Sequence, residues 1–131
     1  MTVHSLAVHP LHLGLGATAI VQPEFTGGAW YEAYGARHGG DGAEGRLVSL
    51  HHFTGSWESW EMHPAGDEVV VCTAGEITLI QEFPGGRIAH VTLAAGEYAV
   101  NPPGVWHTAD IAGEATALFI TAGLGTEGRA R

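Results

Sequence analysis

The sequence predicts an all-β protein whose strands close into a double-sheet jelly roll or a barrel. Almost every apolar run is interrupted by Gly or Pro within about a dozen residues, a spacing typical of all-β sandwiches and barrels. Helical periodicity is hard to find. The chain has 131 residues, 20 of them Gly, which suits one compact domain with many turns. The ten predicted strands exceed what one flat open sheet comfortably holds, so we expect closure.

The predicted strands are short apolar, aromatic or alternating runs, each ended by a turn signal. In chain order they are residues 17–21, 30–34, 46–54, 56–63, 68–73, 76–83, 87–93, 98–101, 105–109 and 115–121. The Gly-rich run 39–42 precedes the third strand, and residues 64–67 separate the fourth from the fifth. Ala74-Gly75 divides the fifth from the sixth, and the turns 84–86, 95–96, 102–104 and 112–113 divide the rest.

Charge and composition exclude several classes of protein. Five Lys and Arg against fourteen Asp and Glu give a net charge of −9, and no basic patch is available to neutralise phosphates. Nucleic acid and anionic membrane surfaces are therefore not expected as partners. Residues 1–22 lack the basic region of a secretion signal and the apolar length of a membrane span. The single Cys72 excludes an internal disulfide framework, so we expect a cytoplasmic protein.

The strand that begins at Glu68 predicts a partner. Successive strand residues face opposite sides, and neither face of residues 68–72 is polar. Such a strand needs cover on both sides, from the N-terminal segment or from a second subunit. We favour a symmetric homodimer. The candidate dimer-surface residues are Trp60, Met62, Val69 and Val71.

Two blocks of the sequence carry a recognisable spacing. The first runs from Gly55 through Glu61-Met62-His63 and Glu68 to Gly75, and the second from Gly96 through Pro102-Pro103-Gly104 to His107. They resemble the two motifs of the cupin superfamily over residues 47–121. The resemblance implies a cupin-type double-stranded β-helix, a jelly-roll barrel. It also implies one divalent metal held by Glu61, His63, Glu68 and His107.

The geometry of these residues can be argued separately. Glu61 and His63 lie two apart on a strand and so face one side. Residues 64–67 are predicted as a hairpin loop that brings Glu68 beside His63, and His107 follows a stiff Pro-Pro-Gly turn. Two imidazoles and two carboxylates suit Mn, Fe, Zn, Ni or Co, and an octahedral shell leaves about two positions open. An open position is what a catalytic metal needs.

The sequence departs from the cupin pattern at two positions. Glu61 replaces the first His of the usual His-x-His, and Ile111 stands where an Asn often closes the second motif. Two interpretations of Glu61 stay open: it is a ligand, or it is a general base beside a three-ligand metal. If it is a ligand, two carboxylates neutralise a divalent ion and favour harder metals such as Mn or Fe. Asp110 is a candidate substitute for the missing Asn.

The remaining candidates have structural alternatives. Cys72 and Trp106 are predicted to be core or packing residues. At most one of His51 and His52 can face the barrel interior, and Trp57 shares the face of Glu61. His4, His9 and His12 are predicted as surface or pocket-lining residues. Within one domain we expect an N-terminal segment at 1–45 that packs on the barrel or on a partner, a barrel core at 46–122, and a tail at 123–131 that is solvated or clasps a partner.

The most direct functional expectation is a small metal-dependent enzyme. Its substrate would be a small oxygen-bearing organic molecule, and the reaction would be dioxygenase-like oxidation at a mononuclear site. Two alternatives stay open, an isomerase or cyclase and a non-catalytic metal-dependent binding protein. A third interpretation, a barrel without metal, requires that Glu61 and Glu68 find hydrogen-bonding partners instead.

Overall fold

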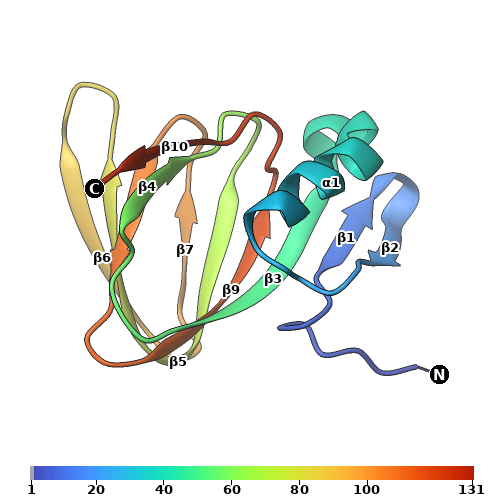
Figure 1. Cartoon of the computed structure of the whole chain (residues 1–131). Coiled ribbons are helices and arrows are strands. Elements are labelled where there is room, and N and C mark those ends of the chain that lie inside the picture. The colour runs from blue at the N-terminus through green and yellow to red at the C-terminus, as the bar shows by residue number, and fades with distance from the viewer. Residues whose placement is uncertain (1) are drawn as a thin grey trace.

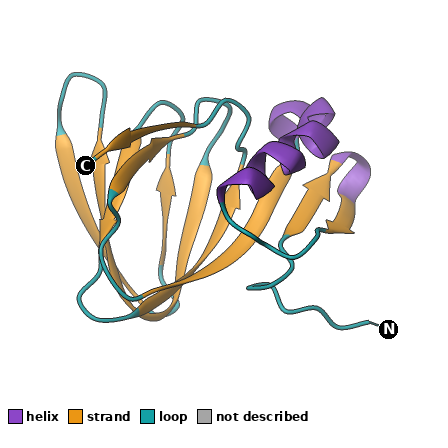
Figure 2. Cartoon of the chain, in the orientation of Figure 1, coloured by secondary structure: helices purple, strands orange, loops and turns teal. Residues whose placement is uncertain are grey.

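The computed structural model, described here for residues 2–131, is built from antiparallel strands with one helical segment (Figures 1 and 2). The elements up to the barrel are β1 (Leu11–Gly14), η1 (Leu15–Ala17), β2 (Thr18–Val21), α1 (Gly28–His38) and η2 (Gly39–Glu44). The barrel strands are β3 (Arg46–Phe53), β4 (Ser59–Met62), β5 (Glu68–Glu82), β6 (Ile88–Ala94), β7 (Tyr98–Asn101), β8 (Trp106–Asp110), β9 (Ala115–Thr121) and β10 (Glu127–Ala130).

The strands form two sheets that share β5. The first sheet runs β7-β5-β9-β3-β1-β2, and the second runs β6-β5-β8-β4-β10, with every pair antiparallel. The closure into a jelly-roll β-barrel predicted from the sequence is confirmed. The apolar core includes Val70, Cys72, Ile77 and Leu79 of β5, all fully buried, together with Phe119 of β9.

One long strand replaces two predicted ones. Residues 68–73 and 76–83 were expected on either side of a turn at Ala74-Gly75, but β5 continues through this point with a bulge between Cys72 and Ala74. Gly75 adopts φ +74°, and a Cβ there would lie 2.2 Å from the carbonyl oxygen of Glu114. Only glycine fits this conformation and this close approach. The bulge lets β5 pass from one sheet to the other.

The predicted strand at 30–34 is wrong, because these residues belong to helix α1. The aromatic residues Trp30, Tyr34 and His38 recur every four residues, which places them on one side of a helix. The rings of Trp30 and Tyr34 stack with centroids 5.5 Å apart, and the Tyr34 and His38 rings follow at 5.4 Å. This stacking outweighs the strand preference of isolated aromatic residues.

The N-terminal elements extend the first sheet within the same chain. β1 pairs with β3, and β2 pairs with β1 at the sheet edge. The helices α1 and η2 lie on the same side of the barrel as β1 and β2, as Figure 2 shows. The tail at 123–131, predicted to be solvated or to clasp a partner, is exposed but pairs with a strand of its own chain. Residues of β10 pair with β4, Gly128 opposite Glu61, so the C-terminal segment is a strand of the second sheet. No helix among residues 2–131 is long and apolar enough to cross a membrane.

The outer face of the first sheet carries two continuous apolar rows. One row crosses six strands, and its members in order are Val100, Val69, Ile120, Val48, Leu11 and Val21. The second row consists of Tyr98, Val71, Leu118 and Leu50. Tyr98 is 68% exposed and Val100 41%. Trp60 and Met62 lie instead on β4 in the second sheet, so we restrict the predicted dimer surface to these rows.

A charge placed in the middle of these rows tests the predicted homodimer. We expect the wild type to sediment as a dimer at micromolar concentration and Val71→Lys as a folded monomer, because a buried lysine without a partner opposes association. His90→Lys, on an exposed position of β6 in the second sheet, is the matched control and leaves the dimer intact. A monomeric wild type would contradict the prediction.

Candidate metal centre

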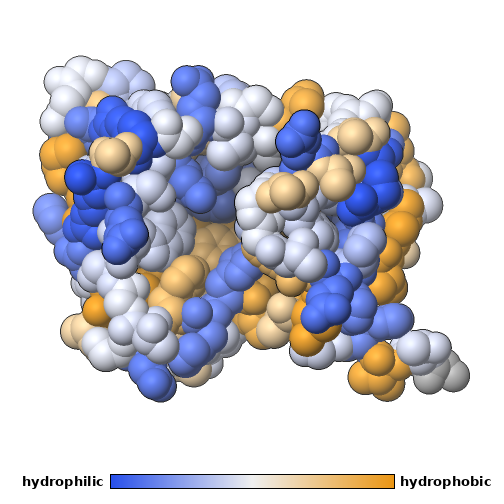
Figure 3. Space-filling view, in the orientation of Figure 1, coloured by the Kyte–Doolittle hydropathy of each residue, from blue (hydrophilic) through white to orange (hydrophobic). Residues whose placement is uncertain are grey.

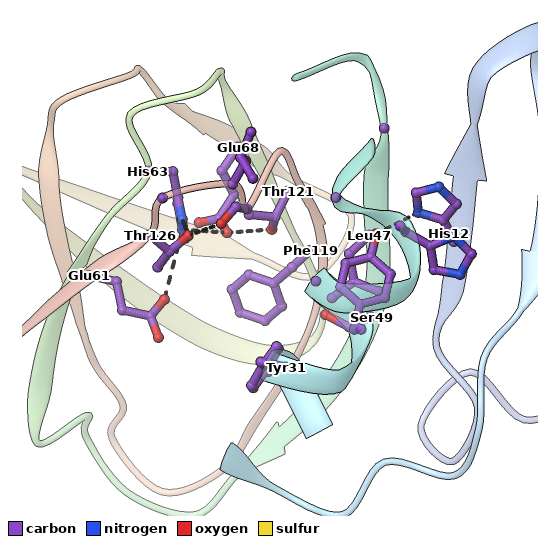
Figure 4. Close-up of a pocket in the computed structure, with 18 of the residues that line it drawn as sticks. His12, Tyr31, Leu47, Ser49, Glu61, His63, Glu68, Phe119, Thr121 and Thr126 are labelled. Carbon is purple, nitrogen blue, oxygen red and sulfur yellow. Dashed lines mark hydrogen bonds and ion pairs between the residues drawn. The ribbon is translucent and has the colours of Figure 1, made fainter. Parts of the chain in front are cut away.

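The four residues predicted as metal ligands converge at one end of the barrel. Glu61 lies near the end of β4, directly opposite His107 on β8, and His63 follows β4 by one residue. Glu68 is the first residue of β5. Glu61, His63 and Glu68 point toward one another in Figure 4. His63, Glu68 and His107 are buried, with exposed fractions of 5%, 3% and 0%.

The loop between β4 and β5 does not form the predicted hairpin. β4 pairs with β8 and β10 in the second sheet, whereas Glu68 opens the part of β5 that belongs to the first sheet. Residues 64–67 therefore cross from one sheet to the other. His63 and Glu68 still meet, because this crossing is short and both side chains face the barrel interior.

The donor atoms of the four residues form a compact group. The Nε2 atom of His63 lies 3.0 Å from Glu68 Oε2, and the Nε2 atom of His107 lies 3.2 Å from Glu68 Oε1. Glu61 Oε2 is 3.9 Å from each of these two nitrogens. Donor atoms of Glu61, His63 and His107 all lie within 4.8 Å of one another. This spacing suits a single cation.

The hydrogen bonds of the two histidines determine their tautomers. His63 Nδ1 lies 2.8 Å from Thr126 Oγ1, and that hydroxyl donates its own proton to the Gly123 carbonyl. The Thr126 oxygen must then accept from His63, so the ring proton is on Nδ1. His107 Nδ1 lies 3.4 Å from the carbonyl oxygen of Val105, which can only accept. In both neutral rings Nε2 therefore carries a lone pair.

These Nε2 lone pairs carry the argument for a cation. Both atoms are buried without an aligned hydrogen-bond partner among residues 2–131, yet both face carboxylate oxygens at 3.0 to 3.2 Å. A lone pair facing a carboxylate is repulsive unless a proton or a metal ion lies between them. Imidazole nitrogens and carboxylate oxygens are the donors that divalent transition metals take in proteins, so the residues present fit such an ion.

Glu68 is held by further buried polar groups. Asn101 Nδ2 donates to Glu68 Oε1 at 3.1 Å, and the Thr121 hydroxyl donates to Oε2 at 2.6 Å. Gln81 Nε2 donates in turn to Asn101 Oδ1 at 2.8 Å. These partners orient both carboxylate oxygens toward the two histidines, an arrangement typical of groups that support metal ligands.

Burial and the neighbouring charged groups together shift the pKa values of Glu68, Glu61 and His63. Burial alone would raise the pKa of Glu68, but the adjacent His107 and His63 outweigh it and lower this pKa well below its usual range. Burial, followed by the charge of Glu68, raises the pKa of Glu61. Burial would lower the pKa of His63, yet its contacts with Glu68 and the charge of Glu61 raise it. The group as a whole therefore holds a positive charge in place, as a proton or as a metal ion.

A cavity of about 690 Å³ opens from this group toward the N-terminal elements. Glu61, His63 and Glu68 line one end, and His107 lies fully buried. Figure 3 shows the surface hollowed between the barrel and the helical segment, with apolar residues at its base. Aromatic side chains form much of the wall, among them Trp57 and Phe119 from the barrel and Tyr31 from α1. A planar organic molecule fits such a lining.

The other histidine, cysteine and tryptophan candidates lie partly in the cavity wall and partly in the core or on the surface. His51 and Trp57 line the cavity, whereas His52 is exposed and bonds Thr116. Cys72 is fully buried in the core. Trp106 packs under the guanidinium of Arg129, with 4.4 Å from Cζ to the ring centroid. His12 is almost fully buried and lines the cavity.

The candidate role of Asp110 is wrong. Its side chain is 49% exposed and accepts a hydrogen bond from the guanidinium of Arg131, so it does not support a metal ligand. Ile111, at the position of the missing Asn, is buried in the apolar core.

Sequence reasoning missed Thr126, Asn101, Thr121 and Tyr31 as site residues. Thr126 lies in the segment predicted as a solvated or partner-clasping tail, and it reaches His63 because β10 pairs with β4. Tyr31 lies in the segment predicted as a strand. Asn101 had a usable signal, since it ends a strand immediately before the Pro-Pro-Gly turn of the second motif.

Comparisons with known proteins point to one family. The family model Cupin_2, described as the cupin domain, matches residues 53–123, more than half of the chain. No curated protein matches the sequence. One similar solved structure is a cupin-2 domain containing protein from Shewanella frigidimarina, 28% identical with a TM-score of 0.49, over 58% of this chain and 69% of that one.

Two solved enzymes share the fold at lower identity. Oxalate oxidase in complex with glycolate is 20% identical with a TM-score of 0.55, over 63% of this chain and 45% of that one. Hydroquinone 1,2-dioxygenase from Sphingomonas sp. TTNP3 with 4-hydroxybenzoate bound is 19% identical with a TM-score of 0.51, over 58% of this chain and 59% of that one.

Removing the hydroxyl that orients His63 tests the tautomer argument. In Thr126→Val we expect metal affinity to fall by about 10- to 100-fold, the usual effect of losing a group that orients a ligand, because His63 loses the acceptor for its Nδ1 proton. Thr126→Ser keeps the hydroxyl and the affinity. Zinc titration by calorimetry measures both variants, and equal affinities for them would contradict the prediction.

Tyr31 offers a test of the pH dependence. Burial and then the charges of Glu61 and Glu68 raise its pKa to about 12, above the value of about 10 in an unfolded chain. As pH rises, the unfolded chain therefore loses the Tyr31 proton before the folded protein does. The contribution of protonated Tyr31 to the free energy of unfolding is complete below about pH 10 and disappears as pH rises toward about 12. We expect the free energy of unfolding to fall more steeply over this range in the wild type than in Tyr31→Phe. Denaturant titrations at several pH values measure the two slopes, and parallel slopes would contradict the assignment.

Proposed function

Because the chain belongs to the cupin family, we propose that it is a small metal-dependent enzyme with a dioxygenase-like activity. In this proposal Glu61, His63, Glu68 and His107 hold one divalent transition metal, which is Mn, Fe, Zn, Ni or Co. The substrate is a small oxygen-bearing organic molecule that enters through the cavity. The observation that supports the proposal best is the pair of buried Nε2 atoms, of His63 and His107, that face the two oxygens of Glu68 at 3.0 and 3.2 Å without an aligned hydrogen bond.

The protein contributes charge balance and orientation. When bound, the divalent ion supplies Lewis acidity toward a substrate oxygen or activates dioxygen. The carboxylates of Glu61 and Glu68 offset its charge. Thr126 and the Val105 carbonyl keep the two imidazoles in the tautomer with Nε2 free, and Asn101 and Thr121 hold Glu68 in line.

Glu61 differs from the other three residues in its exposure. Its side chain is 44% exposed and lines the cavity, so it meets both the ion and the substrate. We propose that it ligates the metal, since its Oε2 atom is equidistant, at 3.9 Å, from the two histidine nitrogens. If it is not a ligand, the same position allows it to act as a general base.

The cavity walls support an aromatic or otherwise planar substrate. Trp57 places its ring 6.2 Å from that of His107, and its indole Nε1 is buried without a hydrogen-bond partner among the described residues. Because this atom is itself buried, Trp57 offers its ring and not its N–H to a bound molecule. The hydroquinone dioxygenase and oxalate oxidase structures hold 4-hydroxybenzoate and glycolate, and ligands of these two kinds are reasonable first candidates here.

Metal content is the first measurement. We expect the purified wild type to contain one divalent ion per chain and His107→Ala and Glu61→Ala to lose it, because each removes one of the few donors. His52→Ala, which removes an exposed histidine, is the matched control and keeps the ion. Retention of metal by Glu61→Ala would make Glu61 a base and not a ligand. Absence of metal from the wild type, even after incubation with all five ions, would overturn the proposal.

Oxygen consumption distinguishes an enzyme from a binding protein. We propose to add catechols, flavonols and β-diketones to the Fe-loaded and Mn-loaded protein and to follow oxygen uptake and absorbance. Uptake that His107→Ala abolishes supports dioxygenase-like activity. Spectral change without uptake supports an isomerase or a non-catalytic binding protein.

A further inference from the structure

The end of the cavity opposite the metal ligands holds a second group of titratable side chains. Asp41 Oδ2 lies 2.7 Å from His12 Nε2, and His12 Nδ1 lies 2.5 Å from the Tyr34 hydroxyl. His12 and Tyr34 both line the cavity. Figure 4 shows His12 at the far end from Glu61 and His63, with Phe119 and Leu47 between them.

The direction of these hydrogen bonds follows from the chemistry of the groups. A carboxylate only accepts, so the proton on His12 lies on Nε2 and points at Asp41. In the neutral ring Nδ1 then accepts, and the Tyr34 O–H donates to it. The three groups form a carboxylate–imidazole–hydroxyl chain of the kind that moves a proton in acid–base catalysis.

Two glycines make room for the Asp41–His12 pair. A Cβ at Gly45 would lie 2.8 Å from Asp41 Cβ and 3.1 Å from His12 Cε1. A Cβ at Gly14 would lie 3.1 Å from Asp41 Oδ2 and 3.3 Å from His12 Nε2. Both glycines have negative φ, −75° and −99°, so space and not backbone conformation requires them. The pair is therefore closely enclosed, and His12 is only 1% exposed.

His12, His38 and Asp41 have donor atoms within 4.8 Å of one another, a spacing that a metal site would also need. The hydrogen bonds disfavour it. Both nitrogens of His12 already have partners. His38 Nε2 accepts from the Gln22 amide at 3.0 Å, and Arg37 fixes that amide by donating to its oxygen. The lone pairs needed for a metal are in use, in contrast to those of His63 and His107.

We propose that Asp41, His12 and Tyr34 form a proton relay that accepts a proton from a ligand hydroxyl at this end of the cavity. This proposal rests on the proposed function. The ligand is an aromatic molecule with an oxygen group at each end: one group is directed to the metal, and the other, a hydroxyl, is directed to Tyr34. The ligand O–H bond breaks and its proton goes to the Tyr34 oxygen. The original Tyr34 proton passes to His12 Nδ1, and the imidazolium is paired with Asp41. No electron is transferred.

The surroundings of Tyr34 keep its hydroxyl available for this exchange. Burial and then the charge of Asp41 raise the pKa of Tyr34 to about 12, while Arg37 opposes this shift. The hydroxyl is thus protonated at neutral pH and passes protons on, without a persistent phenolate. His38 stacks on His12 with centroids 4.0 Å apart, and burial, His12 and Arg37 lower its pKa. Because the His38 ring is neutral, it does not repel the positive charge that His12 carries transiently, and Asp41 compensates that charge.

Two probe ligands that differ by one hydroxyl test the relay. We would bind 4-hydroxybenzoate and benzoate to the zinc-loaded protein, with the carboxylate as the metal-directed group. We expect Tyr34→Phe to weaken 4-hydroxybenzoate by about tenfold, the worth of one good hydrogen bond, and to leave benzoate unchanged. Equal weakening of both ligands would make Tyr34 a structural residue and overturn the relay.

The phenol absorbance of the bound probe gives a second readout. In the wild type we expect the phenol of 4-hydroxybenzoate to ionise at a lower pH than in free solution, and Tyr34→Phe and His12→Gln to abolish this shift. A bound phenol that ionises as it does in water would overturn the proposal. A second metal equivalent in the wild type that is lost in Asp41→Asn would also overturn it, in favour of a metal site.

A further measurement separates this proposal from the proposed function. The ¹⁵N NMR shifts of His12 in the metal-free protein are expected to show a protonated Nε2 and an unprotonated Nδ1, and to change in Tyr34→Phe. The opposite tautomer would refute the relay whether or not the barrel binds metal. If the protein takes up no metal, the proposed function fails while this test stands. If metal-loaded protein binds neither acid, the ligand class is wrong.

Discussion

The site depends on one constraint, the buried carboxylate of Glu68, which is 3% exposed. It lies between His63 and His107, and both of these histidines direct their Nδ1 protons away from it. A buried carboxylate costs several kcal/mol unless cations or hydrogen-bond donors compensate it. Asn101 and Thr121 supply two donors, and the remaining direction faces His63 and His107. A positive charge at that point satisfies all three residues together.

The barrel provides the rigidity that this arrangement requires. Each group comes from a different part of the topology: His63 from the end of β4, Glu68 from the start of β5, His107 from β8 and Thr126 from the turn before β10. Because β5 runs through both sheets, Glu68 and the core residues that follow it belong to one continuous strand. The site is therefore anchored in the same strand that holds the apolar core, and this continuity restricts the relative movement of its residues.

The N-terminal elements turn this barrel site into a cavity with two chemically different ends. One end has carboxylates and imidazoles that face one another without aligned hydrogen bonds, while the other has an imidazole whose two nitrogens are fully engaged. The aromatic wall between them is apolar. Such a division favours a ligand with polar groups at both ends and a flat apolar middle.

Sequence reasoning reached the fold class and the converging residues because both depend on local spacing. The interruption of apolar runs by Gly and Pro, the two-residue step from Glu61 to His63 and the turn before His107 are visible along the chain. The helix at 28–38 was missed because aromatic residues favour strands when taken singly, and only their four-residue recurrence indicates the helix. The continuity of β5 was missed because a Gly in a bulge and a Gly in a turn look alike in sequence.

By itself, the sequence determined the all-β class, the motif spacing and the identity of the converging donors. Only the tertiary structure decided which hydrogen bonds those donors make. His63 bonds Thr126 across 63 residues, and His12 bonds Asp41 across 29, separations at which no periodicity or turn signal relates two positions. The physical reason is that tautomer, burial and protonation depend on the groups that surround a side chain in space, and strand pairing brings those groups together from distant parts of the chain.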